Sequence, residues 1–93
     1  MRKVEFKKTP NNLRKYRKAI GLKQKDVARI LGLKNSGMIC RWEKGRCLPS
    51  LVNAFKLAGL YSVLVDALFF PLKLVIKRKI MERQEDFLRQ ERA

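Results

Sequence analysis

Two cationic side chains within one short stretch have the type and spacing needed to bind an anionic polymer. Arg41 and Lys44 recur with Met38 at every third residue, so in a helix the three would share one exposed face. Ile39 and Trp42 would lie on the opposite face and anchor the helix in a core. Guanidinium and ammonium groups can bind phosphate oxygens, and a guanidinium can also bind the edge of a base. We therefore expect a helix that contacts nucleic acid.

The charge of the whole chain agrees with this chemistry. Its 93 residues include 23 Lys and Arg but only 8 Asp and Glu, which gives a net charge of +15. Such a surface attracts a polyanion, and nucleic acid is the commonest one. The alternatives are an anionic membrane and a solvated cationic surface without a partner. Half of the acidic residues fall in the last twelve positions: Glu82, Glu85, Asp86 and Glu91.

The residue inventory argues against catalysis and against a bound metal. The chain contains no histidine, and no cysteine or serine has an evident base partner. Cys40 and Cys47 are too few for a disulfide framework, and without histidine they cannot build a common zinc site. We expect a protein that is not an enzyme, has no cofactor or metal, and keeps both cysteines as free thiols in a reducing cytosol.

Neither a secretory signal nor a membrane span is expected. The first residues lack the apolar core of a signal peptide. The most apolar stretch, 60–76, is interrupted by Asp66, Pro71 and Lys73, and it falls short of the roughly 20 apolar residues that a membrane span needs. A soluble, cytoplasmic protein is the expectation.

The elements that would position the binding residues are helices separated by glycines. Gly21, Gly32, Gly45 and Gly59 are expected to end helices, and Pro71 is expected in the first turn of a new one. The predicted helices cover about 13–20, 24–31, 36–44, 50–58, 63–69 and the tail from 71. The predicted inward residues are Val27, Ala28, Leu31, Ile39, Trp42, Leu51, Ala54, Phe55 and Ala58. The fold class is all-α.

The second and third predicted helices form a helix-turn-helix. Ala28 must be small because the two helices cross closely, and Gly32 permits the sharp turn between them. Ile39 and Trp42 would lock the third helix so that its other face projects into the DNA major groove, which admits one helix.

This pattern divides the chain into three parts. Residues 1–9 form a basic arm, residues 10–70 the helix-turn-helix domain, and residues 71–93 a C-terminal amphipathic helix. The arm either reaches the DNA backbone or minor groove, or is a disordered, solvated end. The last helix either pairs with a second copy or packs back on the domain. Its basic cluster at 77–79 mildly favours extra DNA contact or a membrane surface.

Two segments carry a family resemblance. LRKYRKAIGLKQKDVARILGL and ICRWEKGRCLPSLVNAFKLAGL, within residues 12–69, resemble the Cro and phage-repressor type of helix-turn-helix, the XRE family. The most specific pieces are Gly21-Leu22-x-Gln24-x-x-Val27-Ala28 and Ile39-x-Arg41-Trp42-Glu43-x-Gly45, in the family's order and at nearly its spacing. The resemblance implies a five-helix, repressor-like DNA-binding domain.

The resemblance also implies roles for single residues. Asn35, Ser36 and Arg41 match positions that read base edges, and Arg41 could bind guanine O6 and N7. Met38 either touches a thymine methyl group or pads the recognition helix. Gln24 would contact phosphate and brace that helix. The further phosphate contacts expected are Lys23, Lys34, Lys44 and Arg46. Arg17 and Glu43 match a partly buried ion pair between the first and third helices.

The sequence departs from the family pattern at three places. Five residues, not the usual four, separate Leu33 from Ile39, so the turn or the start of the recognition helix is longer. Gly37 offers no side chain where relatives often carry a base-reading one. Lys23 replaces the common Ser or Thr cap, so the second helix is expected to start less firmly.

The function implied by the resemblance is transcriptional regulation. The expected protein is a bacterial or phage repressor that binds a two-fold operator in double-stranded DNA as a homodimer, with half-sites about 34 Å apart. Residues 72–92 are the expected dimer element. The alternatives are an antitoxin or accessory regulator that acts with a partner protein, and a protein or membrane interaction module that does not bind DNA.

Overall fold

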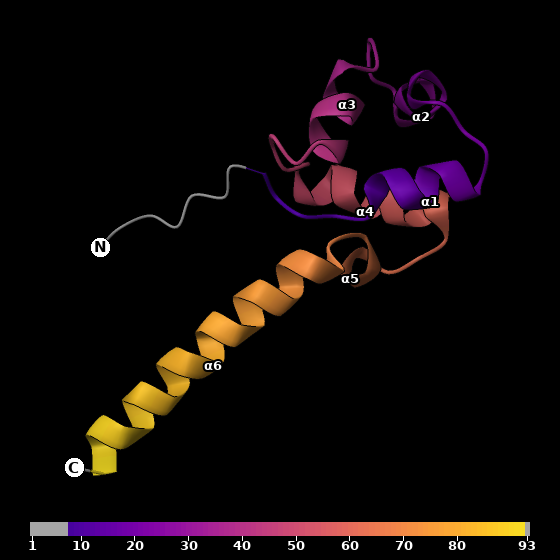
Figure 1. The fold of residues 1–93 in the computed structure, drawn as a ribbon. Coiled ribbons are helices and arrows are strands. Elements are labelled where there is room, and N and C mark those ends of the chain that lie inside the picture. The colour runs from indigo at the N-terminus through magenta and orange to yellow at the C-terminus, as the bar shows by residue number, and fades with distance from the viewer. Residues whose placement is uncertain (1–7, 93) are drawn as a thin grey trace.

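The computed structural model describes residues 8–92, and every regular element within that range is helical. The helices are α1 (Leu13–Ala19), α2 (Gln24–Leu31), α3 (Gly37–Glu43), α4 (Leu51–Tyr61), α5 (Val65–Leu68) and α6 (Phe70–Arg92). Helices α1 to α5 gather into one cluster, and α6 projects away from it as a single long rod (Figure 1). The expected all-α fold is confirmed. Most of the predicted arm, residues 1–7, lies outside the described residues.

One core holds the five short helices together. The inward side of α2 is as predicted, because Val27, Ala28 and Leu31 are all buried. Ile39 and Trp42 of α3 are also buried, at 1% and 2% exposure, which confirms the predicted anchor of that helix. The other members of the core cluster are Leu13, Leu57, Ala58, Tyr61 and Leu68.

The predicted end of α4 at Gly59 is wrong. The helix continues to Tyr61 and ends at Ser62, which adopts a left-handed conformation with φ 55°. A glycine inside a helix costs about 1 kcal/mol relative to alanine. Continuation of the helix buries Tyr61 and adds its ring to the core cluster. Tertiary packing therefore outweighs the local preference of Gly59.

The predicted inward face of α4 is partly wrong for a related reason. Ala54 and Ala58 are buried as expected, but Leu51 and Phe55 are 71% and 61% exposed. The helix is apolar on most of its circumference, so its sequence does not single out one inward side. The packed side instead combines the two alanines with Leu57 and Tyr61 at helical spacing.

The remaining boundaries differ by small amounts. Helix α5 is shorter than the predicted 63–69, and α1 ends before Ile20, whose side chain is exposed. Pro71 lies in the first turn of α6, as predicted. Proline fits there because a first-turn N–H has no partner within the helix.

Gly45, just after α3, is the glycine that the fold constrains most. Its φ is 74°, which side-chain-bearing residues rarely adopt. The backbone N–H of Thr9 donates a hydrogen bond to the Gly45 carbonyl at 2.8 Å. A Cβ at residue 45 would overlap the Thr9 carbonyl oxygen and lie 2.7 Å from its nitrogen. Only glycine lets the N-terminal segment pass this close to the end of α3.

We expect Gly45→Ala to destabilise the protein more than Gly21→Ala. Both glycines have positive φ, but a Cβ at Gly21 meets no atom within 4 Å. Gly21→Ala should therefore cost only the conformational penalty of about 1–2 kcal/mol, and Gly45→Ala should cost more because Thr9 must move. Urea unfolding of the two variants beside the parent measures the difference. Equal losses would show that the Thr9 contact contributes nothing.

Candidate nucleic-acid interface

The start of α2 is firmer than its Lys23 cap position suggests. The Asp26 carboxylate accepts a hydrogen bond from the Lys23 backbone N–H at 2.9 Å. This bond is the acidic half of a capping box, and the negative charge also suits the positive end of the helix dipole. Lys23 makes no side-chain cap bond, as its type predicts, but the bond from Asp26 to the N-cap backbone offsets part of that loss.

The turn between α2 and α3 explains how the extra residue fits. Gly32 ends α2 in a left-handed conformation, and the Leu33 N–H returns to the Ala28 carbonyl at 2.8 Å. The Asn35 side-chain oxygen then accepts a hydrogen bond from the Gly37 N–H at 2.8 Å, which is a local turn that starts α3. The added residue is thus taken up by a side-chain turn before the helix.

Gly37 lies close to the side chain that makes this turn. A Cβ at position 37 would lie 2.9 Å from the Asn35 side-chain oxygen, so a side chain there would require Asn35 to shift. The glycine thus leaves room for the bond that starts α3. The Asn35 side chain remains exposed, and its amide N–H groups can still donate to a ligand.

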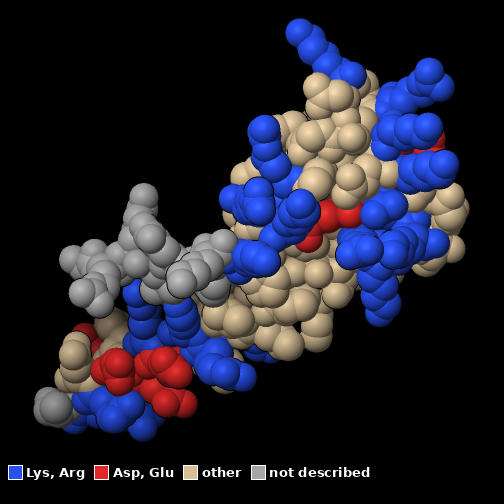
Figure 2. Space-filling model, turned by 45° about the horizontal axis from the view of Figure 1, so that its top comes forward, with Lys and Arg blue, Asp and Glu red and all other residues tan. Residues whose placement is uncertain are grey.

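The basic residues expected to bind DNA are at the surface around α3. Arg41 on α3 and Lys44 after it are exposed, as predicted, whereas Met38 is half-buried and packs against the core. The Met38 sulfur lies 3.5 Å from an Arg41 nitrogen, which is a weak polar contact. Lys23, Lys34 and Arg46 are exposed, whereas Gln24 and Ser36 are half-buried. In Figure 2, Lys and Arg side chains are spread over the visible face of the domain around one acidic patch, and a second acidic group lies at the opposite end of the molecule.

A buried ion pair fixes the orientation of α3. Arg17 Nε lies 2.6 Å from Glu43 Oε2 and Arg17 Nη2 lies 3.0 Å from Glu43 Oε1, with side chains 10% and 4% exposed. Arg17 Nη1 also donates to the Leu22 carbonyl at 2.9 Å, and Gln24 Nε2 donates to Glu43 Oε1 at 3.0 Å. One carboxylate at the end of α3 therefore ties that helix to α1 and to the start of α2.

The contacts of this ion pair affect the pKa values of Arg17 and of the neighbouring Tyr61. The hydrogen bond to Glu43 raises the pKa of Arg17, and it outweighs the desolvation that would lower it. Burial raises the pKa of Tyr61 to about 12, and the negative charge of Glu43 adds to the effect. The guanidinium therefore keeps its charge and the phenol its proton across the physiological range.

Two asparagines just before α1 make long-range hydrogen bonds, and one of them reaches the same end of α3 as the ion pair. Asn11 Nδ2 donates to the Trp42 carbonyl at 3.0 Å, while its side-chain oxygen accepts from the Leu13 N–H at 3.0 Å. Asn12 donates through its side chain to the Ala67 carbonyl at 3.2 Å. The segment before α1 thus joins α3 to α5. A pair of asparagines before a helix predicts the cap alone, so the long-range bonds had no sequence signal.

We expect removal of either partner of the ion pair to be strongly destabilising. Arg17→Met leaves a buried carboxylate, and Glu43→Leu leaves a buried guanidinium without its counter-charge; each should cost about 3–5 kcal/mol. The double variant Arg17→Met/Glu43→Leu should cost much less than the sum. Urea unfolding and a double-mutant cycle measure the coupling.

The exposed pair Arg89–Asp86 on α6 is the control for this experiment. Its side chains are 74% and 65% exposed, so Arg89→Met should change stability by less than about 1 kcal/mol. Additive losses in the Arg17–Glu43 cycle would contradict the role of the pair as the brace of α3.

Comparison with known proteins agrees with this geometry. A helix-turn-helix family model matches residues 13–68. An uncharacterised HTH-type transcriptional regulator of Methanocaldococcus jannaschii is 39% identical over 59 residues, which cover 63% of this chain and 88% of the relative. No solved structure matches. Within residues 8–92, no helix combines the length and hydrophobicity needed to cross a bilayer. The chain belongs to the XRE-type helix-turn-helix family of DNA-binding transcriptional regulators.

Proposed function

We propose that this protein is a transcriptional repressor that binds a two-fold operator as a homodimer. Each copy would insert α3 into a major groove of double-stranded DNA. The observation that carries the proposal is the rigid presentation of one basic surface: Arg41 is exposed on a helix whose opposite side, Ile39 and Trp42, is buried. The brace between Arg17 and Glu43 supports it by fixing that helix to α1.

The contacts that we propose fall into two kinds. Arg41 reads a base edge, assisted by the Asn35 amide and by Ser36 at the start of α3. Met38 contributes at most one edge of its side chain because it is half-buried. Phosphate contacts position the protein without reading sequence. We assign those contacts to the exposed flanking cations Lys23, Lys34, Lys44 and Arg46.

Gln24 can serve both as a brace and as a phosphate contact. Its amide nitrogen carries two hydrogens, and one of them is directed to Glu43 at 3.0 Å. The second hydrogen can bind a phosphate at the start of α2. The Gln24 side chain would then bind a DNA phosphate and Glu43 of α3 at the same time. Gln24 would thus link the DNA backbone directly to the recognition helix.

The proposed parts of the chain are residues 10–70 for DNA binding and residues 71–93 for pairing of two copies. The protein would act by binding, without catalysis, in the cytoplasm where DNA is accessible. Repression would follow from occupation of a promoter by the dimer.

The first test is binding to duplex DNA as a function of salt. Several phosphate contacts should make the logarithm of the affinity fall steeply and linearly with the logarithm of salt concentration. Fluorescence anisotropy with a random-sequence duplex measures this slope. Negligible affinity at low salt would overturn the proposal.

The second test separates reading of bases from binding of phosphate. With a duplex selected from a random pool, Arg41→Ala should lose about 1–3 kcal/mol of discrimination, which is roughly ten- to a hundredfold. Lys44→Ala should weaken selected and random duplexes alike and reduce the salt slope by about 1. Lys56→Ala, on an exposed site of α4, is the control and should leave both quantities unchanged. Identical effects of Arg41→Ala on the two duplexes would contradict its assignment.

A further inference from the structure

Helix α6 leaves the domain and exposes apolar side chains along its length. It has 23 residues, or about 34 Å, and every residue from 80 to 92 is exposed. Most helices in proteins owe their stability to packing of an apolar face rather than to intrinsic propensity. The exposed apolar residues on α6 are Phe70, Leu74, Ile76, Ile80, Met81, Phe87 and Leu88. We therefore expect α6, with its exposed apolar side chains, to pack against a partner surface.

One groove on α6 has a regular apolar floor and charged walls. Leu74, Met81 and Leu88 are spaced by seven residues, which is the repeat of a helix that packs along another helix. Their side chains are about half exposed, at 47%, 51% and 43%. The groove around the first two is lined by Leu74, Lys77, Arg78, Met81, Glu82 and Glu85.

The charges of this groove are separated along the helix. Lys77 and Arg78 lie before Met81, and Glu82 and Glu85 lie after it. Within residues 8–92 these four side chains form no ion pair. The same polarity extends to the helix as a whole, because residues 70–81 carry four basic and no acidic side chains, whereas residues 82–92 carry three basic and four acidic ones. The groove is therefore basic at one end and acidic at the other.

We propose that α6 pairs in antiparallel orientation with α6 of a second copy, with the two-fold axis near Met81. Leu74 then lies opposite Leu88 of the second copy, and the two Met81 side chains meet. Lys77 and Arg78 lie beside Glu85 and Glu82 of the second copy. A parallel pair would instead place like charges together. A two-fold interface must be self-complementary, and this groove has that property only in the antiparallel arrangement.

The pairing also fixes the distance between the two DNA-binding domains. Met81 is eleven residues from Phe70, so the two points where α6 leaves its domain lie about 33 Å apart along the paired helices. The domains are held apart, and each remains free to meet its own half-site. This role of the pair rests on the proposed function, but the pairing itself can be tested without DNA.

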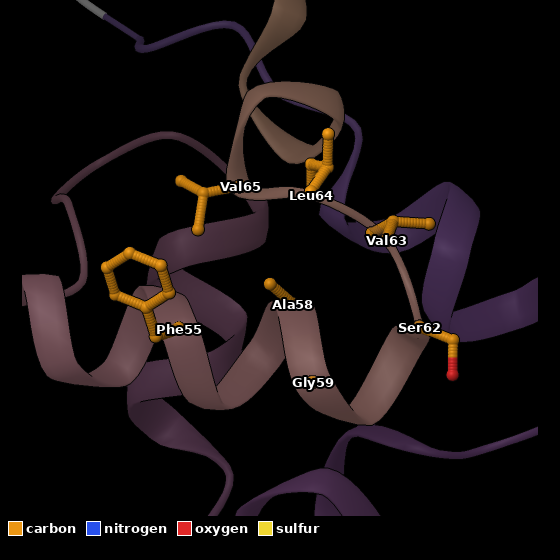
Figure 3. A pocket seen from close by; sticks show the side chains of 7 residues that line it. All are labelled: Phe55, Ala58, Gly59, Ser62, Val63, Leu64 and Val65. Atoms are coloured by element: carbon orange, nitrogen blue, oxygen red, sulfur yellow. The ribbon is translucent and has the colours of Figure 1, made fainter.

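Another exposed apolar surface lies on α4 and must be distinguished from α6. Phe55 and Ala58 of α4 line an open groove with the segment 62–65 (Figure 3). All of its lining side chains are uncharged, so nothing in this groove selects the orientation or identity of a partner. Of these two grooves, the one on α6 carries a charge pattern that matches a second copy of itself.

Disulfide cross-linking of full-length protein without DNA tests the orientation. Cys40 and Cys47 are both free and are first replaced by serine or alanine, with helical content checked by circular dichroism. Under mild oxidation, Met81→Cys should cross-link to itself. Leu74→Cys should not, but a mixture of Leu74→Cys and Leu88→Cys chains should form the mixed dimer. Self-cross-linking of Leu74→Cys would show a parallel pair and overturn the proposal.

Charge reversal tests the forces that hold the pair. The parent should be a dimer in sedimentation at tens of micromolar. Lys77→Glu/Arg78→Glu should shift it toward monomer by at least tenfold in dissociation constant, and addition of Glu82→Lys/Glu85→Lys should restore it. Arg83→Glu is the control, since residue 83 lies about 200° around the helix from Met81. A monomeric parent, or a dimer lost only on Phe55→Asp, would overturn the proposal. Cross-links without DNA binding would leave the pair intact and refute the proposed function alone.

Discussion

The structure depends on one buried carboxylate. Glu43 lies at the end of α3, 4% exposed, and accepts two hydrogen bonds from Arg17 and one from Gln24. A buried charge without partners would be very costly, so these bonds are obligatory rather than optional. They join three helices at one point, and that point is two residues from the exposed Arg41. The direction in which α3 presents its basic side chains is thus set by this polar contact together with the buried Ile39 and Trp42.

The segment before α1 supplies a second set of polar contacts that hold α3. Asn11 and Asn12 carry hydrogen bonds to the carbonyls of Trp42 and Ala67, and Thr9 bonds to Gly45. These contacts hold the final turn of α3 and the following loop, which contains Arg46. These hydrogen bonds add rigidity to a domain with a small core. They pair backbone carbonyls with asparagine side chains where water would otherwise be needed. The end of α3 and the loop after it are therefore held both by the contacts of Glu43 and by the segment before α1.

Much of this could be predicted from the sequence, and the failures have a common cause. The bounds of α2, its inward residues and the anchor of α3 follow from local spacing and from glycines at the helix ends. The Arg17–Glu43 contact came from the family resemblance. Helix α4 was misjudged because it is apolar nearly all round, so its buried side depends on which neighbours arrive. The long-range bonds of Asn11 and Asn12 depend on three-dimensional approach, which spacing along the chain does not encode.

The turn before α3 also limits how the specificity of this protein can change. A side chain at position 37 would press on the Asn35 oxygen, which accepts the bond that starts the helix. A new side chain at that end of α3 therefore requires Asn35 to shift and weaken this bond. Arg41, exposed and outside the brace, carries no such penalty. During adaptation to a new operator, substitutions should therefore appear first in the later turn of α3, at Arg41. The start of the same helix should change more slowly.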